Sequence, residues 1–108
     1  MKINQSRFNS LEAIPDIKHT FILRHPKLPV NLYSKDKALE LLTPYHEEGI
    51  KALGYSANDV AVAEQVHSDQ VYIVDTSKGF ESPISSVDGL ITFQKNLLLG
   101  IYVADCCA

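Results

Sequence analysis

The sequence predicts an α+β domain that contains more strand than helix. Two observations carry this prediction: a well-delimited helical stretch lies in the first half of the chain, and from residue 60 onward the apolar pattern changes to the two-residue period of strands. The chain has 108 residues, of which 45% are hydrophobic. This composition suits a single small globular domain with a modest core.

The first half of the chain predicts a strand, a loop and the start of a helical region. Residues 19–25 (HTFILRH) form a short apolar run, which predicts a strand. Two prolines interrupt the segment that follows, at residues 25–34, and predict a loop of fixed course. Residues 34–42 (SKDKALELL) predict two helical turns that are capped by Ser34 or Asp36.

A second, separate helix is expected after these turns. Thr43 and Pro44 have the chemistry of an N-cap and a first helical residue, and Gly54 stands where a C-terminal cap belongs. A glycine inside this stretch weakens the helix by about 1 kcal/mol relative to alanine. The expected inward stripe consists of Tyr45, Ile50 and Leu53.

The second half of the chain predicts a series of strands. Residues 59–66 (DVAVAEQV) and 70–75 (QVYIVD) alternate as strands with one face inward, and the residues between them form a corner. Residues 76–86 are rich in Ser, Gly and Pro and predict a surface loop. Another strand begins with residues 88–93 (DGLITF). After a turn, residues 97–107 (LLLGIYVADCC) predict a strand that is buried on both faces.

Composition and charge exclude several classes of function. The formal net charge of -3 is spread through the sequence, so neither nucleic acid nor a membrane surface is an expected partner. No apolar run reaches the roughly 18 to 20 residues that a bilayer requires, and the N-terminus lacks the apolar core of a signal peptide. We therefore expect a cytoplasmic protein.

The residues best suited to chemistry stand at the ends of predicted strands. His67 lies at the corner after one strand, and Asp105, Cys106 and Cys107 lie at the end of another. Adjacent cysteines do not easily form a disulfide, because a trans peptide holds their Cα atoms about 3.8 Å apart. Imidazole and thiolate together suit a zinc site or an activated thiol nucleophile. Solvation of the histidine and burial of the cysteines as apolar filler remain open.

Three segments resemble a known family. Residues 64–75 (EQVHSDQVYIVD), 87–92 (VDGLIT) and 99–108 (LGIYVADCCA) are similar, in order and in spacing, to the signature segments of the multicopper polyphenol oxidoreductase, or laccase-domain, family. The upstream FILRH and LPVNL are similar to family segments more loosely. Family members are mostly described as zinc-dependent purine nucleoside phosphorylases with adenosine deaminase activity. The resemblance implies mixed β-sheets flanked by helices, in an αββα-type layered domain of which residues 1–108 form the N-terminal half.

The resemblance also implies roles for individual residues. His67 and Cys106 match two metal ligands of the family and would hold a catalytic zinc, with copper as the alternative. Asp105 matches the aspartate before that cysteine and would orient the ligand or polarise the substrate. Arg24 and Asn31 fall where the family places pocket residues that meet phosphate or ribose. The implied substrates are phosphate and a purine nucleoside: adenosine, inosine or methylthioadenosine.

The chain also departs from the family pattern. The family's third metal ligand is a histidine in a segment like A-H-A-G-W-R-G beyond the cysteine motif, and this chain has no Trp. We therefore expect residues 1–108 to be a fragment or a truncated form. Ser68 replaces the usual glycine and Gly89 the usual alanine, and neither replacement is expected to change the chemistry. Gln65 is expected to be structural. The remaining histidines, which are not obvious replacement ligands, are His19, His25 and His46.

Alternatives from other classes stay open on the sequence alone. Copper in the same site would give a laccase-like enzyme that oxidises phenols. Cys106 and His67 without metal would give a thiol enzyme, which alkylation inactivates and chelators do not. A chain without activity would act only as a structural or binding module. The sequence makes no prediction of oligomeric state.

Overall fold

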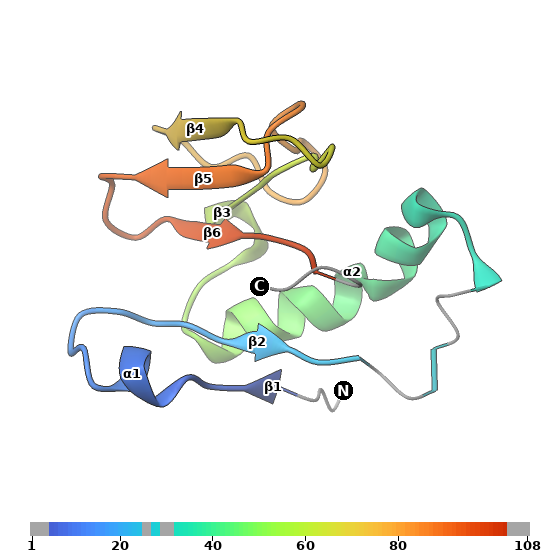
Figure 1. Cartoon of the computed structure of the whole chain (residues 1–108). Coiled ribbons are helices and arrows are strands. Elements are labelled where there is room, and N and C mark those ends of the chain that lie inside the picture. The colour runs from blue at the N-terminus through green and yellow to red at the C-terminus, as the bar shows by residue number, and fades with distance from the viewer. Residues whose placement is uncertain (1–4, 25–26, 29–31, 104–108) are drawn as a thin grey trace. The chain divides into compact units, whose positions relative to one another are not determined.

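Helices and strands are divided between two groups along the chain. The computed structural model describes residues 5–24, 27–28 and 32–103, and contacts divide the chain into a first unit, residues 1–54, and a second unit, residues 55–108. The first unit contains β1 (Gln5–Ser6), α1 (Asn9–Glu12), β2 (Phe21–Ile22) and α2 (Lys35–Ala52). The second contains the 3-10 helix η2 (Ala57–Asp59), β3 (Val60–Val62), β4 (Val71–Val74), β5 (Gly89–Thr92) and β6 (Leu98–Gly100) (Figure 1). The predicted α+β class is confirmed, but the expectation of more strand than helix is wrong: within the described residues α2 alone has 18 residues, as many as the six strands together.

A small antiparallel pair organises the start of the first unit. β1 pairs with β2, with Gln5 opposite Ile22 and Ser6 opposite Phe21. The Phe8 ring stacks on the His19 ring at a centroid distance of 5.9 Å, and the Phe8 backbone N–H donates to His19 Nε2 at 2.7 Å. This bond occupies the Nε2 lone pair of His19, so that this ring nitrogen already has a hydrogen-bond partner.

α2 is one continuous helix, so the prediction of two separate helices is wrong. The Ser34 side chain accepts from the Lys37 N–H at 3.3 Å and caps the helix as predicted. The Thr43 hydroxyl donates back to the Leu39 carbonyl at 2.8 Å instead of capping a new helix, and Pro44 lies inside α2. The helix therefore continues through Pro44, and no second helix begins there.

No helix in the described residues is both long and apolar enough to span a membrane.

The end of α2 follows the prediction. Gly54 adopts a φ of 88°, and its N–H donates to the Lys51 carbonyl at 2.9 Å, which closes the last turn. Of the predicted inward stripe, Ile50 and Leu53 are buried and Tyr45 is half-buried. The glycine that weakened the helix prediction, Gly49, lies on this buried face.

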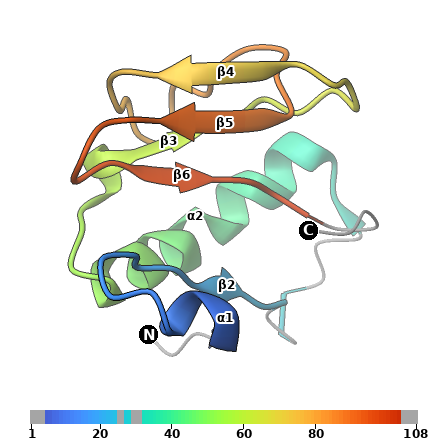
Figure 2. The same ribbon diagram turned by 60° about the vertical axis from the view of Figure 1, so that its left-hand side comes forward.

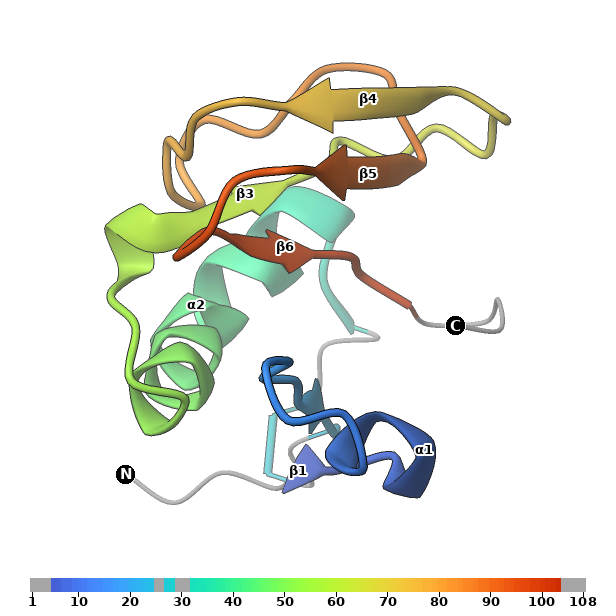
Figure 3. The same cartoon turned by 90° about the vertical axis from the view of Figure 1, so that its left-hand side faces the viewer.

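The second unit is built from two parallel strand pairs. β3 pairs with β6, with Val62 opposite Gly100, and β4 pairs with β5, with Val71 opposite Gly89. β5 and β6 lie side by side and run in opposite directions (Figure 2). Figure 3 shows these strands from another side: β5 lies between β4 and β6, and β4 lies at the outer edge. The carboxyl ends of β3 and β6 therefore lie at the same end of the unit as the amino ends of β4 and β5.

β3 is the most deeply buried strand, and the prediction that it has only one inward face is wrong. Val60, Ala61, Val62 and Ala63 are each at most 3% exposed. The predicted surface loop also pairs with the free edge of β3: the Ile84 N–H donates to the Val62 carbonyl at 2.8 Å, and the Glu64 N–H donates to the Ile84 carbonyl at 2.8 Å. Part of the predicted loop therefore extends the sheet.

Two further burial predictions are wrong. β4 does not alternate: Val71, Tyr72 and Ile73 are exposed and only Val74 is buried. β6 was expected to be buried on both faces, yet Leu99 is 37% exposed and Ile101, just beyond the strand, is 45% exposed. Apolar composition alone does not bury a strand, because elements must pack on both of its faces. Within the described residues these two strands are covered incompletely.

Stability should fall as the pH drops through the histidine range. Burial lowers the pKa of the His46 imidazole on α2 below the ordinary value of about 6.5. The contribution of neutral His46 is therefore fully present above about pH 6.5 and decreases as the pH falls below it. The urea midpoint should be lower at pH 5.5 than at pH 7.5 in the wild type, and His46→Gln should reduce this difference. A difference of unchanged size in the variant would contradict the assignment.

The close approach of β3 and β6 should depend on Gly100. A Cβ at this position would lie 2.8 Å from Val62 Cγ1, which is shorter than any normal contact. Gly100→Ala should lower the free energy of unfolding by about 1–3 kcal/mol, measured by urea denaturation. Gly89→Ala is the matched comparison: its Cβ would meet Val71 Cγ2 at 3.1 Å, and that side chain is exposed and able to turn away. A larger loss for Gly89→Ala than for Gly100→Ala would refute this account.

Candidate functional site

The ends of β3 and β6 are joined by one side chain. Gln65 Nε2 donates to the Tyr102 carbonyl at 2.8 Å, and the Tyr102 N–H donates to Gln65 Oε1 at 2.7 Å. The amide of Gln65 thus pairs with the backbone of Tyr102 as a neighbouring strand would. Gln65 therefore has the structural role that the sequence predicts. Its side chain links the segment that leads to His67 with the segment that leads to Asp105 and Cys106.

The turn at His67 is held by the carboxylate of Asp88. The N–H groups of Val66, His67 and Ser68 donate to Asp88 at 3.2, 2.9 and 2.8 Å, and the Ser68 hydroxyl donates to Asp88 Oδ2 at 2.6 Å. His67 itself has a φ of 61°, in the left-handed region. The turn that follows β3 and the residue that precedes β5 therefore form one hydrogen-bonded unit.

These bonds determine the ionisation of Asp88. The Ser68 hydroxyl contributes most, followed by the Ser68 backbone N–H with smaller contributions from the N–H groups of Val66 and His67, and together they lower the pKa of Asp88 to about 2. The carboxylate is therefore ionised at neutral pH. The sequence predicted no effect of serine in place of the usual glycine at position 68. In the structure the Ser68 hydroxyl donates the shortest of these bonds, which a glycine could not make.

Sequence reasoning missed the role of Asp88. The residue belongs to the VDGLIT segment that carried the family resemblance, but the segment indicates only an aspartate before a strand. Its partners lie about 20 residues earlier in the chain. Local sequence patterns do not predict hydrogen bonds over such a separation. The only signal in the sequence was that residues 64–75 and 87–92 occur in the order and spacing of the family segments.

His67 is free to bind a ligand. The residue is exposed, and within the described part of the chain no hydrogen bond or ion pair engages its imidazole. Its backbone is fixed while its ring nitrogens remain available, which suits a metal ligand or a proton-transfer group.

The other residues predicted for the site are not brought together by the described structure. Asn31, Asp105 and Cys106 lie outside the described residues, as does the neighbouring Cys107. Arg24 is exposed and follows β2 in the first unit. Across residues 5–24, 27–28 and 32–103, no group of three His, Cys, Asp or Glu side chains is arranged to hold a metal ion. The assignments of these residues stay predictions.

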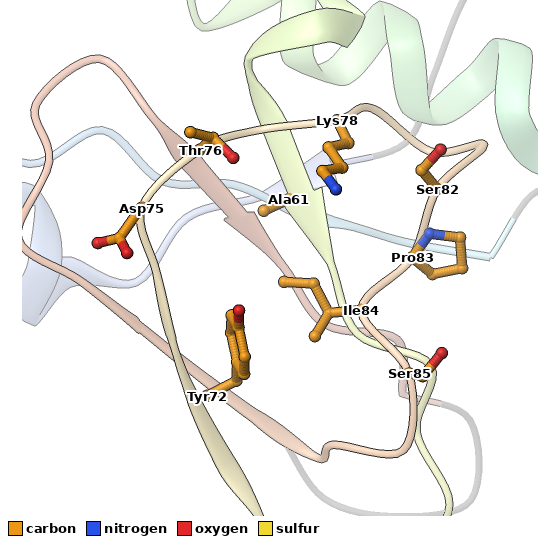
Figure 4. A pocket seen from close by; sticks show the side chains of 9 residues that line it. All are labelled: Ala61, Tyr72, Asp75, Thr76, Lys78, Ser82, Pro83, Ile84 and Ser85. Carbon is orange, nitrogen blue, oxygen red and sulfur yellow. The ribbon is translucent and has the colours of Figure 1, made fainter.

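A separate pocket lies in the second unit (Figure 4). It has a volume of about 530 Å³ and lies between β3, β4 and the loop that follows β4. Tyr72 and Ile84 provide apolar surface, while Asp75 and Lys78 provide opposite charges. Neither Arg24 nor His67, the predicted site residues that the structure describes, lines this pocket, and the candidate site is the His67 turn with the adjoining strand ends.

Comparison with known proteins identifies the family. Residues 27–108 match the family described as "Multi-copper polyphenol oxidoreductase laccase". The chain belongs to this family. The match includes every residue of the His67 turn, Asp88 and the end of β6, so the segments that meet in the structure all lie within the family domain.

Two curated relatives of this laccase-domain chain carry the name purine nucleoside phosphorylase. The protein of Corynebacterium glutamicum is 35% identical over 54 residues, which are 50% of this chain and 22% of the relative. The protein of Streptomyces coelicolor is 34% identical over 65 residues, which are 60% of this chain and 26% of the relative. The matched part of the chain thus spans about a quarter of each relative. No solved structure matches the chain.

Removal of the Gln65 amide should loosen the end of β6. Gln65→Ala leaves the Tyr102 N–H and carbonyl without these two bonds, and we expect a loss of about 1–3 kcal/mol in the free energy of unfolding. Amide hydrogen exchange at Tyr102 should become faster. The control is Gln94→Ala, which removes an exposed glutamine side chain in the same unit. Equal stability and equal Tyr102 exchange in the two variants would argue against the link.

Proposed function

We propose that this chain is part of a purine nucleoside phosphorylase that acts on adenosine, inosine or methylthioadenosine. The observation that carries the proposal is the meeting of the three family segments at one end of the second unit, through Gln65 and Asp88. The names of the curated relatives support this substrate class. Because the chain spans only part of those proteins, the activity is proposed for the intact family domain.

His67 and Cys106 are the proposed ligands of zinc. The exposed imidazole of His67 has the chemistry that zinc prefers, and a cysteine thiolate is a suitable second donor. Zinc bound there would supply Lewis-acid chemistry and lower the pKa of a bound water. Asp105 is proposed to orient the ligand or to polarise the substrate. A cytoplasmic location belongs to the same proposal, since a reducing compartment keeps Cys106 and Cys107 as thiols.

The proposed reaction places phosphate against the sugar. A phosphate oxygen attacks the anomeric carbon of the ribose, the C–N bond to the purine breaks, and its electron pair leaves with the base, which takes up a proton. The products are the free purine and the sugar 1-phosphate, which is ribose 1-phosphate for adenosine and inosine and methylthioribose 1-phosphate for methylthioadenosine. Arg24 is proposed to bind phosphate through the planar fork of its guanidinium, and Asn31 to bind phosphate or ribose.

Two further activities are proposed as alternatives or additions at this site. Adenosine deamination requires attack of water on C6 and release of ammonia, and it is proposed for the same site. Oxidation of phenols with copper is the alternative that the family's description suggests. Nucleoside with phosphate, and phenol with oxygen, are chemically distinct substrate pairs, so product analysis separates the two proposals.

An assay of the intact family domain that contains this chain tests the proposal. With inosine and phosphate the protein should release hypoxanthine and ribose 1-phosphate, and the release should require phosphate. His67→Asn should lower kcat/KM by about a hundredfold or more, because it removes the imidazole while asparagine still tolerates a positive φ.

The control is Asn96→Ala. Asn96 is also exposed with a positive φ of 60° in the second unit, but it lies outside the proposed site, so this variant should keep wild-type activity. Release of no free base from any purine nucleoside, together with copper-dependent oxidation of a phenol, would replace the phosphorylase assignment with the oxidoreductase.

A further inference from the structure

Asp88 binds the turn that carries His67, and it does so entirely through the backbone and Ser68. We infer that Asp88 is a positioning residue for His67: its carboxylate fixes the left-handed turn from which the imidazole projects, and Ser68 completes its binding. The inference rests on the proposed role of His67 as a metal ligand. It gives the VDGLIT segment a function that the sequence alone does not assign.

The left-handed conformation of His67 has an energetic cost. A residue other than glycine with a positive φ occupies a sparsely populated conformation and persists only when its surroundings hold it there. Around His67 three consecutive backbone N–H groups point to one acceptor, the ionised carboxylate of Asp88. Hydrogen bonds to a charged acceptor are stronger than neutral ones. Asp88 is therefore the group that stabilises this conformation.

Asp88 is itself held in place by its neighbours. Asp88 directly precedes β5, and its own N–H donates to the Gln70 carbonyl at 2.9 Å, next to the start of β4. The preceding residue, Val87, is 8% exposed. The position of His67 is thus tied to the β4–β5 pair, in addition to its covalent connection to β3.

The hydrogen bonds to Asp88 leave the imidazole of His67 available. Asp88 binds the N–H of His67 and no atom of its ring, so it acts on the position of the histidine rather than on its protonation. The Ser68 hydroxyl binds the same Asp88 oxygen as the Ser68 N–H, which adds a contact that the family's usual glycine could not make. Ser68 therefore strengthens the turn in this chain in particular.

The test compares two aspartates that differ by position and not by charge. Asp88→Asn removes the charged acceptor of the turn. Asp69→Asn removes the same charge two residues from His67, where, among the described residues, the carboxylate accepts from the side chain of Gln70 at 3.2 Å and binds no backbone of the turn. Ser68→Ala is the milder variant that leaves the backbone bonds to Asp88 in place. Each variant is measured in the full chain by amide hydrogen exchange, by NMR of the His67 ring and by titration with zinc.

Asp88→Asn should speed exchange of the Val66, His67 and Ser68 amides by about tenfold or more while the β4 amides keep their protection. The His67 ring signals should broaden or split, and zinc affinity should fall about 10- to 100-fold. Ser68→Ala should show smaller effects in the same direction, and Asp69→Asn should match the wild type. Unchanged exchange and ring signals in Asp88→Asn, or equal effects of Asp69→Asn, would overturn the inference.

The measurements also separate this inference from the proposed function. If the wild type does not bind zinc, the proposed metal role of His67 fails, while exchange and ring signals without metal still decide whether Asp88 positions the residue. If zinc binds and Asp88→Asn binds it as tightly as the wild type does, the positioning role fails and the metal site stands.

Discussion

The parallel pairing of β3 with β6 is the constraint on which the candidate site depends. Parallel strands deliver the segments that follow them to the same end of a sheet, and here those segments carry His67 on one side and lead toward Asp105 and Cys106 on the other. Gln65 continues the pairing beyond the strands by binding the backbone of Tyr102. Gly100 permits the close approach, because Val62 occupies the space that a side chain there would need.

A second constraint acts across the other strand pair. Asp88 ties the His67 turn to the start of β5, so that the turn is fixed from two directions. The three segments that identify the family are therefore connected by hydrogen bonds of a Gln side chain and an Asp side chain. Neither residue is a proposed metal ligand, and both act by holding backbone that carries or leads to one.

Much of the fold can be predicted from local sequence, and most of what could not be predicted depends on residues that are distant in sequence. Ser34 and Gly54 have the chemistry of helix caps and occupy those places, and β4 and β5 lie within the predicted strands. The split of α2 at Pro44 was wrong, since the Thr43 hydroxyl bonds backward along the helix. Burial of β3, and the role of Asp88, depend on residues distant in sequence. For the candidate site, His67 and Gln65 could be singled out from sequence, whereas the hydrogen bonds around them could not be predicted.

One measurement tests most directly whether the family segments act as a single site. Zinc is titrated into the isotopically labelled chain, and backbone and side-chain NMR signals are followed residue by residue. The account predicts that signals of the His67 turn, Tyr102 and Cys106 shift together and saturate at one zinc per chain. Shifts confined to His19, His25 or His46, or a response of His67 without Cys106, would contradict it.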